Sequence, residues 1–342
     1  MSAPINYLTR EYLAPFQNKR ANERHVADTI CTPDQELGLE QNLQLAKGRG
    51  VKFVIIGVPE DIGPRANCGN GGAYLGWQNF LSVNLNQQAN AFFDWSTCLL
   101  LGSVDVEDIQ QNSYQADGSS LEVSELRALC QQIDDRVEAV LTPIFAHGFE
   151  VIVIGGGHNN AYPIIKSLYN ASGARVACAN LDPHADFRAI EGRHSGNPFR
   201  YAYQEGALSH YCVVGLHEQK NNQMTISALD DAGFPYFSYQ SIFMSRRVTI
   251  DNAIEQAKDY VANSSTQIGV ELDVDAIKNA GASAYSIAGF SVEQAIQYVH
   301  SVASCGEVKY LHLCEAAPIG DSNDSGQLLT QLLYSYLQAR SN

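Results

Sequence analysis

Residues of the types that bind metals follow three apolar runs of this chain. His158 follows the run VIVIGGG, the segment DPHAD follows VACANL, and DVD follows QIGVEL. The side chains concerned are those of His158, Asp182, His184, Asp186, Asp273 and Asp275. In extended backbone, residues two apart face the same side, so the members of each segment should converge. Because buried carboxylates repel one another, such a cluster requires nearby cations.

The number and chemistry of these side chains predict a binuclear metal centre. Six ligands exceed what one catalytic ion with an open water position needs, but they suit two ions about 3.5–4 Å apart that share carboxylates. Four carboxylates and two imidazoles form a hard donor set, which favours Mn²⁺ over zinc. Each motif alone has a plainer explanation, such as a loop histidine or an Asx turn. Their joint occurrence favours a metal-dependent hydrolase.

The elements that must position these residues alternate regularly along the chain. Short apolar runs are separated by amphipathic stretches, which predicts an α/β fold with a mainly parallel sheet flanked by helices. Ligands of such sheets gather at the carboxyl ends of the strands. The predicted strands are 51–57, 151–157, 176–181, 210–216, 234–239, 267–275 and 309–315. The predicted helices are 123–148, 161–171, 222–233, 251–263, 291–303 and 325–338.

No linker or internal repeat divides the chain. We therefore predict a single α/β domain over 46–342, with residues 1–45 as helical or coil decoration and 103–120 as a surface loop. The eight cysteines form no close pairs and are expected to be buried free thiols.

Composition excludes several classes of partner. A net charge of -15 argues against nucleic acid as a partner, because phosphate binding requires clustered Lys and Arg. No apolar run approaches the roughly 20 residues that cross a membrane, and the polar start lacks a signal-peptide core. We therefore expect a cytoplasmic protein without a membrane partner.

The metal motifs resemble those of the ureohydrolase family, which comprises arginases, agmatinases and formimidoylglutamases. GGGH (155–158), DPHAD (182–186) and ELDVD (271–275) occur in the family's order, and similarity extends upstream to 57–76 and downstream to CEAAP (314–318). The resemblance implies an arginase-like three-layer α/β/α fold. It also implies two Mn²⁺ ions that activate water, hydrolysis of C–N bonds in a small amidine or guanidine, and a homo-oligomer.

The same resemblance assigns roles to individual residues. One ion would be held by His158, Asp182, Asp186 and Asp273, and the other by Asp182, His184, Asp273 and Asp275, with Asp182 and Asp273 bridging. Asp186 would relay a proton to the leaving amine. Glu315 would pair with the cationic nitrogens of the substrate, although a carboxylate that merely caps the last strand is an alternative.

Among family members, the chain is most similar to formimidoylglutamase. Gly157 and Ser195 stand where arginases have Asp and a catalytic His, and SGNPFR (195–200) resembles a formimidoylglutamase segment. The implied reaction converts N-formimidoyl-L-glutamate and water to L-glutamate and formamide, a step of histidine degradation. Candidate substrate contacts are Arg188, Arg200, Ser195, Asn197 and Glu315, since Arg pairs well with carboxylates. His194 is either a proton shuttle or a solvent-exposed loop residue.

Two other functions stay open at this point. One is a guanidino hydrolase of the agmatinase, arginase or guanidinobutyrase type that releases urea, and the other is a non-catalytic relative that acts as a binding protein. Asn159, Glu271 and Lys278 depart from the family's pattern. By period two, Glu271 shares a strand face with Asp273 and Asp275, where it could alter the hydrogen bonds around the ligands or the metal preference.

Overall fold

The computed structural model describes residues 3–18, 20–264 and 266–341, and these contain a nine-stranded sheet. β1 pairs antiparallel with β3, and all other neighbours are parallel. In spatial order the strands are β1 (Ile5–Tyr7), β3 (Cys98–Val104), β2 (Phe53–Gly57), β4 (Glu150–Ile154), β9 (Val308–Cys314), β8 (Gln267–Asp273), β5 (Val176–Leu181), β6 (Leu208–Leu216) and β7 (Tyr236–Ser238). The predicted α/β fold with a mainly parallel sheet is confirmed.

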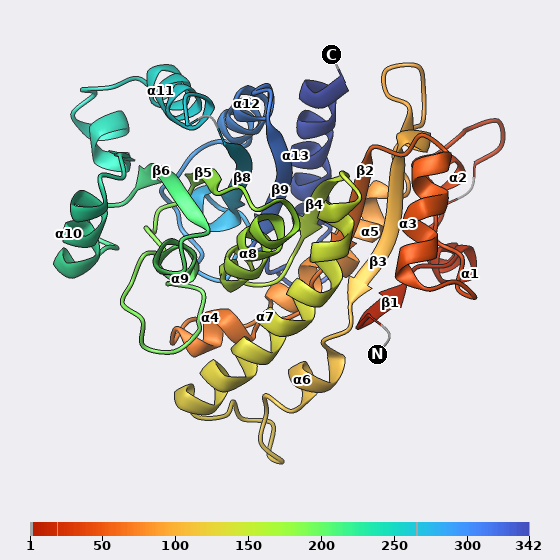
Figure 1. The fold of residues 1–342 in the computed structure, drawn as a ribbon, viewed down its shortest axis with the longest axis horizontal. Coiled ribbons are helices and arrows are strands. Elements are labelled where there is room, and N and C mark those ends of the chain that lie inside the picture. Colours follow the sequence, from red (N-terminus) through yellow and green to blue (C-terminus); the bar gives the residue numbers. More distant parts are fainter. Residues whose placement is uncertain (1–2, 19, 265, 342) are drawn as a thin grey trace.

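Helices cover both faces of the sheet and form separate hydrophobic cores with it (Figure 1). One face is covered by α5 (Gly76–Asn84), α11 (Ile250–Ala262), α12 (Val292–Ala303) and α13 (Asp324–Ser341). The other is covered by α3 (Leu39–Gly48), α7 (Val123–Ala146), α8 (Ala161–Ser172), α9 (Pro198–Gln204) and α10 (Gln223–Ala232). The result is three layers, α/β/α.

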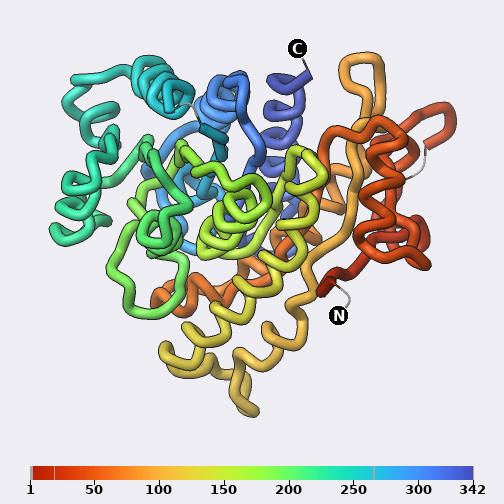
Figure 2. The backbone as a smooth tube through the Cα atoms, viewed as in Figure 1, coloured from red at the N-terminus to blue at the C-terminus, as the bar shows by residue number. Residues whose placement is uncertain are grey.

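Four of the α-helices are short: α1 (Arg10–Leu13), α2 (Val26–Thr29), α4 (Ile62–Ala66) and α6 (Glu107–Gln111). In Figure 2 the N-terminal segment lies beside the β1–β3 edge of the sheet, and the green to cyan segment that contains β7 lies at the opposite edge. β4, β8 and β5, which lead to the predicted metal ligands, each have at least two strands on either side.

The central strands form because their sequences are continuously apolar. Every residue of β2 and of β5 is buried, as expected for strands covered on both faces. On α7, buried residues recur at helical spacing and form one stripe that packs on the sheet; they include Leu126, Cys130, Ile133, Val137, Val140 and Ile144. Continuous apolar runs thus account for the central strands, and apolar residues at helical spacing account for α7.

The observed fold differs from the sequence prediction at one edge. β3 was not predicted, and the predicted surface loop over 103–120 contains the end of β3 and all of α6. Residues 5–7, expected as helix or coil, form β1, because Ile5 pairs with Val104 of β3. A three-residue strand is recognisable only through its partner, so its own sequence carries little signal.

Two general predictions concern the thiols and membrane spans. All eight cysteines are free; six are buried, while Cys31 is half-buried and Cys68 is exposed. Among the described residues, no helix combines the length and apolar character needed to cross a bilayer.

Candidate metal centre

The predicted metal ligands lie at the carboxyl ends of the central strands. β4, β9, β8 and β5 are neighbours in the sheet and run parallel, so their carboxyl ends meet there. His158 lies just after β4, Asp182 directly follows β5, and Asp273 ends β8. Glu315 directly follows β9.

Four of the predicted ligands converge on one point. His158, Asp182, Asp186 and Asp273 each offer one donor atom, and these atoms lie within 4.8 Å of one another. His158 Nδ1 is 3.1 Å from Asp182 Oδ2, 2.8 Å from Asp186 Oδ2 and 3.3 Å from Asp273 Oδ2. Nevertheless, this fully buried nitrogen has no hydrogen-bond partner in the part of the chain that the structure describes. A buried nitrogen among carboxylate oxygens, without a hydrogen bond, fits a metal ligand.

A second group adjoins the first. His184, Asp273 and Asp275 also offer donor atoms within 4.8 Å of one another, so Asp273 belongs to both groups. His184 Nδ1 lies 3.4 Å from Asp182 Oδ1 and 3.9 Å from Asp275 Oδ2. Two adjoining groups with a shared carboxylate are the arrangement that a pair of divalent ions requires.

Backbone amides orient the carboxylates. Asp182 Oδ1 accepts from the His184 amide at 2.6 Å, and Asp273 Oδ1 accepts from the Asp275 amide at 2.7 Å. Asp275 Oδ1 accepts from the Ala284 amide at 3.0 Å. In each case the backbone fixes one carboxylate oxygen, while the other oxygen faces a histidine of the cluster.

Burial and mutual repulsion raise the pKa values of three of these carboxyl groups. For Asp275, burial acts together with the charge of Asp273; for Asp186 and Asp273, burial acts together with the charge of Asp182. Burial by itself would lower the pKa of His184, but Asp182 raises it to about 9. A divalent cation would relieve this repulsion, so the residues present fit a metal centre.

Mn²⁺ should therefore raise the melting temperature more at about pH 8.5 than at about pH 6. In the metal-free protein, the carboxyl groups with raised pKa values destabilise the folded state increasingly as the pH rises above about 4. That value is the pKa of these groups in the unfolded chain, about 4. The His184 contribution is complete below about pH 6.5 and is lost as the pH rises through about 9. A bound cation replaces these protons. The measurement is thermal unfolding at both pH values, with and without Mn²⁺.

The same linkage predicts that Mn²⁺ affinity rises with pH, about tenfold per pH unit for each proton displaced. Excess chelator is the control, because it should return both samples to their metal-free melting temperatures. A Mn²⁺-induced shift that is equal at the two pH values, or larger at the lower one, would contradict this expectation.

Glu315 is hydrogen-bonded to the turn that carries His158. Glu315 Oε1 accepts from the His158 amide at 2.7 Å, Oε2 accepts from the Ser283 hydroxyl, and the Glu315 amide donates to Gly156 O at 2.9 Å. Gly156 has a φ of 75°, and a Cβ there would lie 2.7 Å from the carbonyl oxygen of Val58, so the turn requires glycine. Glu315 itself has a φ of 61°, a strained value that marks functional turns.

Among the other predicted site residues, His194 and Asn197 form hydrogen bonds within their own loop. The His194 ring is buried, and its contacts among the described residues are with Glu191, Gly196 and Asn197. Burial lowers its pKa to about 4, so it is neutral at physiological pH and is not the solvent-exposed residue of the alternative prediction. Asn197 accepts from Arg193 Nη1 at 2.7 Å and donates to the backbone of 189–192, which stabilises the loop.

Two of the arginines in the motif loops form buried ion pairs. Arg65 contacts Asp61 at 2.9 Å, and Arg193 contacts Asp134 at 2.7 Å. Both guanidinium groups therefore neutralise carboxylates of the fold. Neither is therefore free to bind a carboxylate of a substrate.

The two arginines predicted to bind substrate are placed differently. Arg200 lies over the ring of Phe187 at 5.0 Å. Arg188 contacts Glu191 at 3.2 Å, but 44% of its side chain is exposed. Ser195, a further candidate, is buried and donates its amide to Gly63 O at 3.1 Å. Of these three residues, Arg188 is exposed, Arg200 is half-buried and Ser195 is buried.

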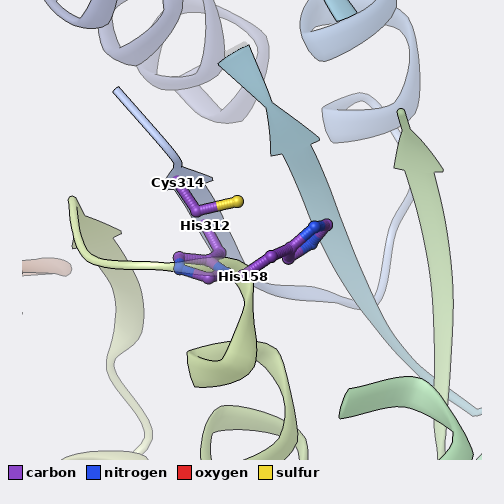
Figure 3. Close-up of side chains that lie close together, drawn as sticks. All are labelled: His158, His312 and Cys314. Atoms are coloured by element: carbon purple, nitrogen blue, oxygen red, sulfur yellow. The ribbon is translucent and has the colours of Figure 1, made fainter. Parts of the chain in front are cut away.

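Sequence reasoning missed a buried polar cluster beside His158. His158, His312 and Cys314 offer donor atoms within 4.8 Å of one another, and Figure 3 shows the last two arising from β9 and His158 from the turn after β4. His312 also contacts Glu271, whose role had been left open. The signal was present, because polar residues at 310, 312 and 314 recur with period two in an otherwise apolar strand.

Comparison with known proteins assigns the family. The family model "Arginase family" matches residues 51–338. This chain belongs to the arginase family. Formimidoylglutamase of Corynebacterium efficiens is 24% identical over 293 residues, which cover 84% of each chain. Formimidoylglutamase of a Geobacillus species is 26% identical over 276 residues, covering 79% of this chain and 78% of the relative.

Solved structures share the fold of this arginase-family chain. Trypanosoma cruzi formiminoglutamase with Mn²⁺ aligns with a TM-score of 0.72 and 19% identity over 94% of this chain and 99% of that chain. Bacillus subtilis formimidoylglutamase aligns with a TM-score of 0.74 and 17% identity over 95% and 94%. The predicted arginase-like three-layer architecture is confirmed.

Proposed function

We propose that this chain hydrolyses N-formimidoyl-L-glutamate to L-glutamate and formamide with two Mn²⁺ ions. The proposed ligands are His158, Asp182, His184, Asp186, Asp273 and Asp275. The observation that carries the proposal is this complete set of ligands in a chain similar to relatives named formimidoylglutamase over 84% of both lengths. The Mn²⁺ assignment is supported by the hard donor set and by the ion named for the Trypanosoma cruzi structure.

The ions would supply hydroxide at neutral pH by lowering the pKa of water to about 7. The residues of the chain would then orient the substrate and move protons. Asp186 Oδ2 lies 2.8 Å from His158 Nδ1, among the donor atoms that would hold the first ion. We assign Asp186 to proton transfer to the leaving amine and Glu315 to binding of the cationic amidinium.

The substrate carboxylates would be met at the rim of the site. Arg188 belongs to the loop that follows Asp186. Its exposed guanidinium can donate hydrogen bonds to a carboxylate of the substrate in addition to Glu191. Arg200 is a weaker candidate because its guanidinium stacks on Phe187. Ser195 and Asn197 would support this loop rather than provide charge.

A guanidino hydrolase is the second candidate. It is favoured by the burial of Arg65 and Arg193 in ion pairs. Few cationic side chains are then left to bind a substrate that has two carboxylates. Proclavaminate amidino hydrolase of Streptomyces clavuligerus aligns with a TM-score of 0.65 and 18% identity over 85% of this chain and 93% of that chain. A non-catalytic binding protein is disfavoured, because such a chain would be expected to lose metal ligands and this one retains all six.

The test is a substrate panel with Mn²⁺-loaded protein. Formimidoylglutamate, arginine, agmatine and guanidinobutyrate are supplied at equal concentration, and release of formamide or urea is measured. We expect the highest kcat/KM for formimidoylglutamate, with no turnover after chelation. Turnover confined to agmatine, which has no carboxylate, would overturn the proposal, and turnover of guanidinobutyrate alone would favour the second candidate.

A further inference from the structure

A buried glutamate lies behind the metal-binding side of His158. Glu271 is fully buried inside β8 and is paired in register with Asn180 of β5 and His312 of β9. These three residues form a buried polar row across three adjacent strands. Burying a carboxylate without hydrogen bonds costs free energy of folding. We therefore expect Glu271 to have hydrogen-bond partners and a function.

The partners of Glu271 come from β9. Glu271 Oε1 accepts from the Tyr310 hydroxyl at 2.7 Å, and Oε2 lies 2.7 Å from His312 Nδ1. Gly269 makes this possible, because a Cβ there would lie 2.2 Å from Tyr310 Cζ. The Tyr310 ring therefore occupies the space above Gly269 to reach the carboxylate. Glu271 is thus held from two directions by donors of the adjacent strand.

The carboxylate oxygen of Glu271 that contacts His312 also faces His158. His158 Nε2 lies 3.5 Å from Glu271 Oε2, while Nδ1 on the other side of the ring faces the carboxylates of the metal centre. Among the described residues, the buried Nε2 has no hydrogen-bond partner, and Glu271 Oε2 is the carboxylate oxygen that it faces. A proton on Nε2 leaves the lone pair on Nδ1.

We propose that Glu271, held by Tyr310 and His312, positions His158 and fixes its tautomer so that Nδ1 is available to the metal. This inference rests on the proposed function only in assuming that a divalent ion binds His158. Glu271 acts through His158 and is a positioning residue. Carboxylates behind metal-bound histidines commonly contribute 10–100-fold to metal affinity, because they orient the ring and increase its basicity.

The test is Mn²⁺ titration of Glu271→Gln, followed by electron paramagnetic resonance of free and bound Mn²⁺. We expect one of the two Mn²⁺ sites to weaken about 10–100-fold, while the site on His184 and Asp275 changes less than about threefold. Glu150→Gln is the matched control, because Glu150 is another strand glutamate that accepts from a tyrosine hydroxyl, that of Tyr336 at 3.0 Å. Glu150 lies at the opposite end of β4 from His158, so its substitution should leave both affinities unchanged.

Two further outcomes are decisive. Mn²⁺ affinities within about threefold of the wild-type values in Glu271→Gln, even with a lower melting temperature, would overturn the proposal and leave Glu271 a structural residue. If that variant does not fold, Tyr310→Phe removes one donor without removing the ring; it should weaken the same site, and equal affinities would again overturn the proposal. The titration uses no substrate, so failure to turn over formimidoylglutamate leaves this result unaffected.

Discussion

Asp273→Asn is expected to abolish metal-dependent hydrolysis. Asp273 is the residue shared by the two groups of donor atoms, and it is almost completely buried. The amide has the shape of the carboxylate but not its charge, and a neutral oxygen is a poor ligand for two cations. We expect kcat/KM to fall at least ~10³-fold, which corresponds to about 4 kcal/mol of transition-state stabilisation. Steady-state kinetics and metal content after Mn²⁺ loading provide the measurement.

The stability of Asp273→Asn distinguishes lost ligation from unfolding. In the metal-free protein the charge of Asp273 contributes to the raised pKa of Asp275, so its removal relieves repulsion. Asn Oδ1 can still accept from the Asp275 amide, as Asp273 Oδ1 does at 2.7 Å. The metal-free variant should therefore melt no lower than the metal-free wild type. Its melting temperature should respond little to Mn²⁺.

Asp117→Asn serves as the control, because Asp117 is an exposed loop carboxylate that bonds Ser119. It should retain wild-type activity and metal content. An Asp273→Asn protein that binds two Mn²⁺ ions and keeps a tenth or more of wild-type kcat/KM would show that Asp273 is not shared between the ions.

The position of the metal centre was predictable because it follows from topology. Apolar runs identified the central strands, and polar residues that directly follow parallel strands necessarily meet at one edge of the sheet. The argument from extended backbone was wrong in detail. Residues after Leu181 leave β5 at once, Asp186 has a φ of 46°, and Asp275 lies in the short helical turn Val274–Ala276. The side chains converge through these turns rather than through strand alternation.

Contacts between distant segments were not predictable from the sequence. The partner of Arg193 is Asp134 on α7, which lies 59 residues earlier in the chain, so no local pattern identifies the pair. Likewise, Glu271 looks like an isolated departure from the family's pattern until the register of β8 and β9 places His312 beside it. Local sequence patterns identify the strands. Which buried charges pair with one another depends on how the strands are ordered in the sheet.

Glu315→Gln should reduce kcat/KM while the protein retains both Mn²⁺ ions. Burial raises the pKa of Glu315 well above its usual range, and Asp273 and Asp275 raise it further, so a cationic amidinium would favour its charged form. Loss of one partner from a buried charge pair costs about 2–5 kcal/mol, so kcat/KM should fall at least ~30-fold.

The fold should tolerate Glu315→Gln because the amide can satisfy the same partners. Its oxygen can accept from the His158 amide, and its NH₂ group can donate to the Ser283 hydroxyl, which then accepts instead of donating. Wild-type metal content combined with low kcat/KM would therefore separate substrate binding at Glu315 from metal binding at Asp273. If Glu315→Gln keeps kcat/KM within about threefold of wild type, Glu315 only caps β9 and the amidinium is recognised elsewhere.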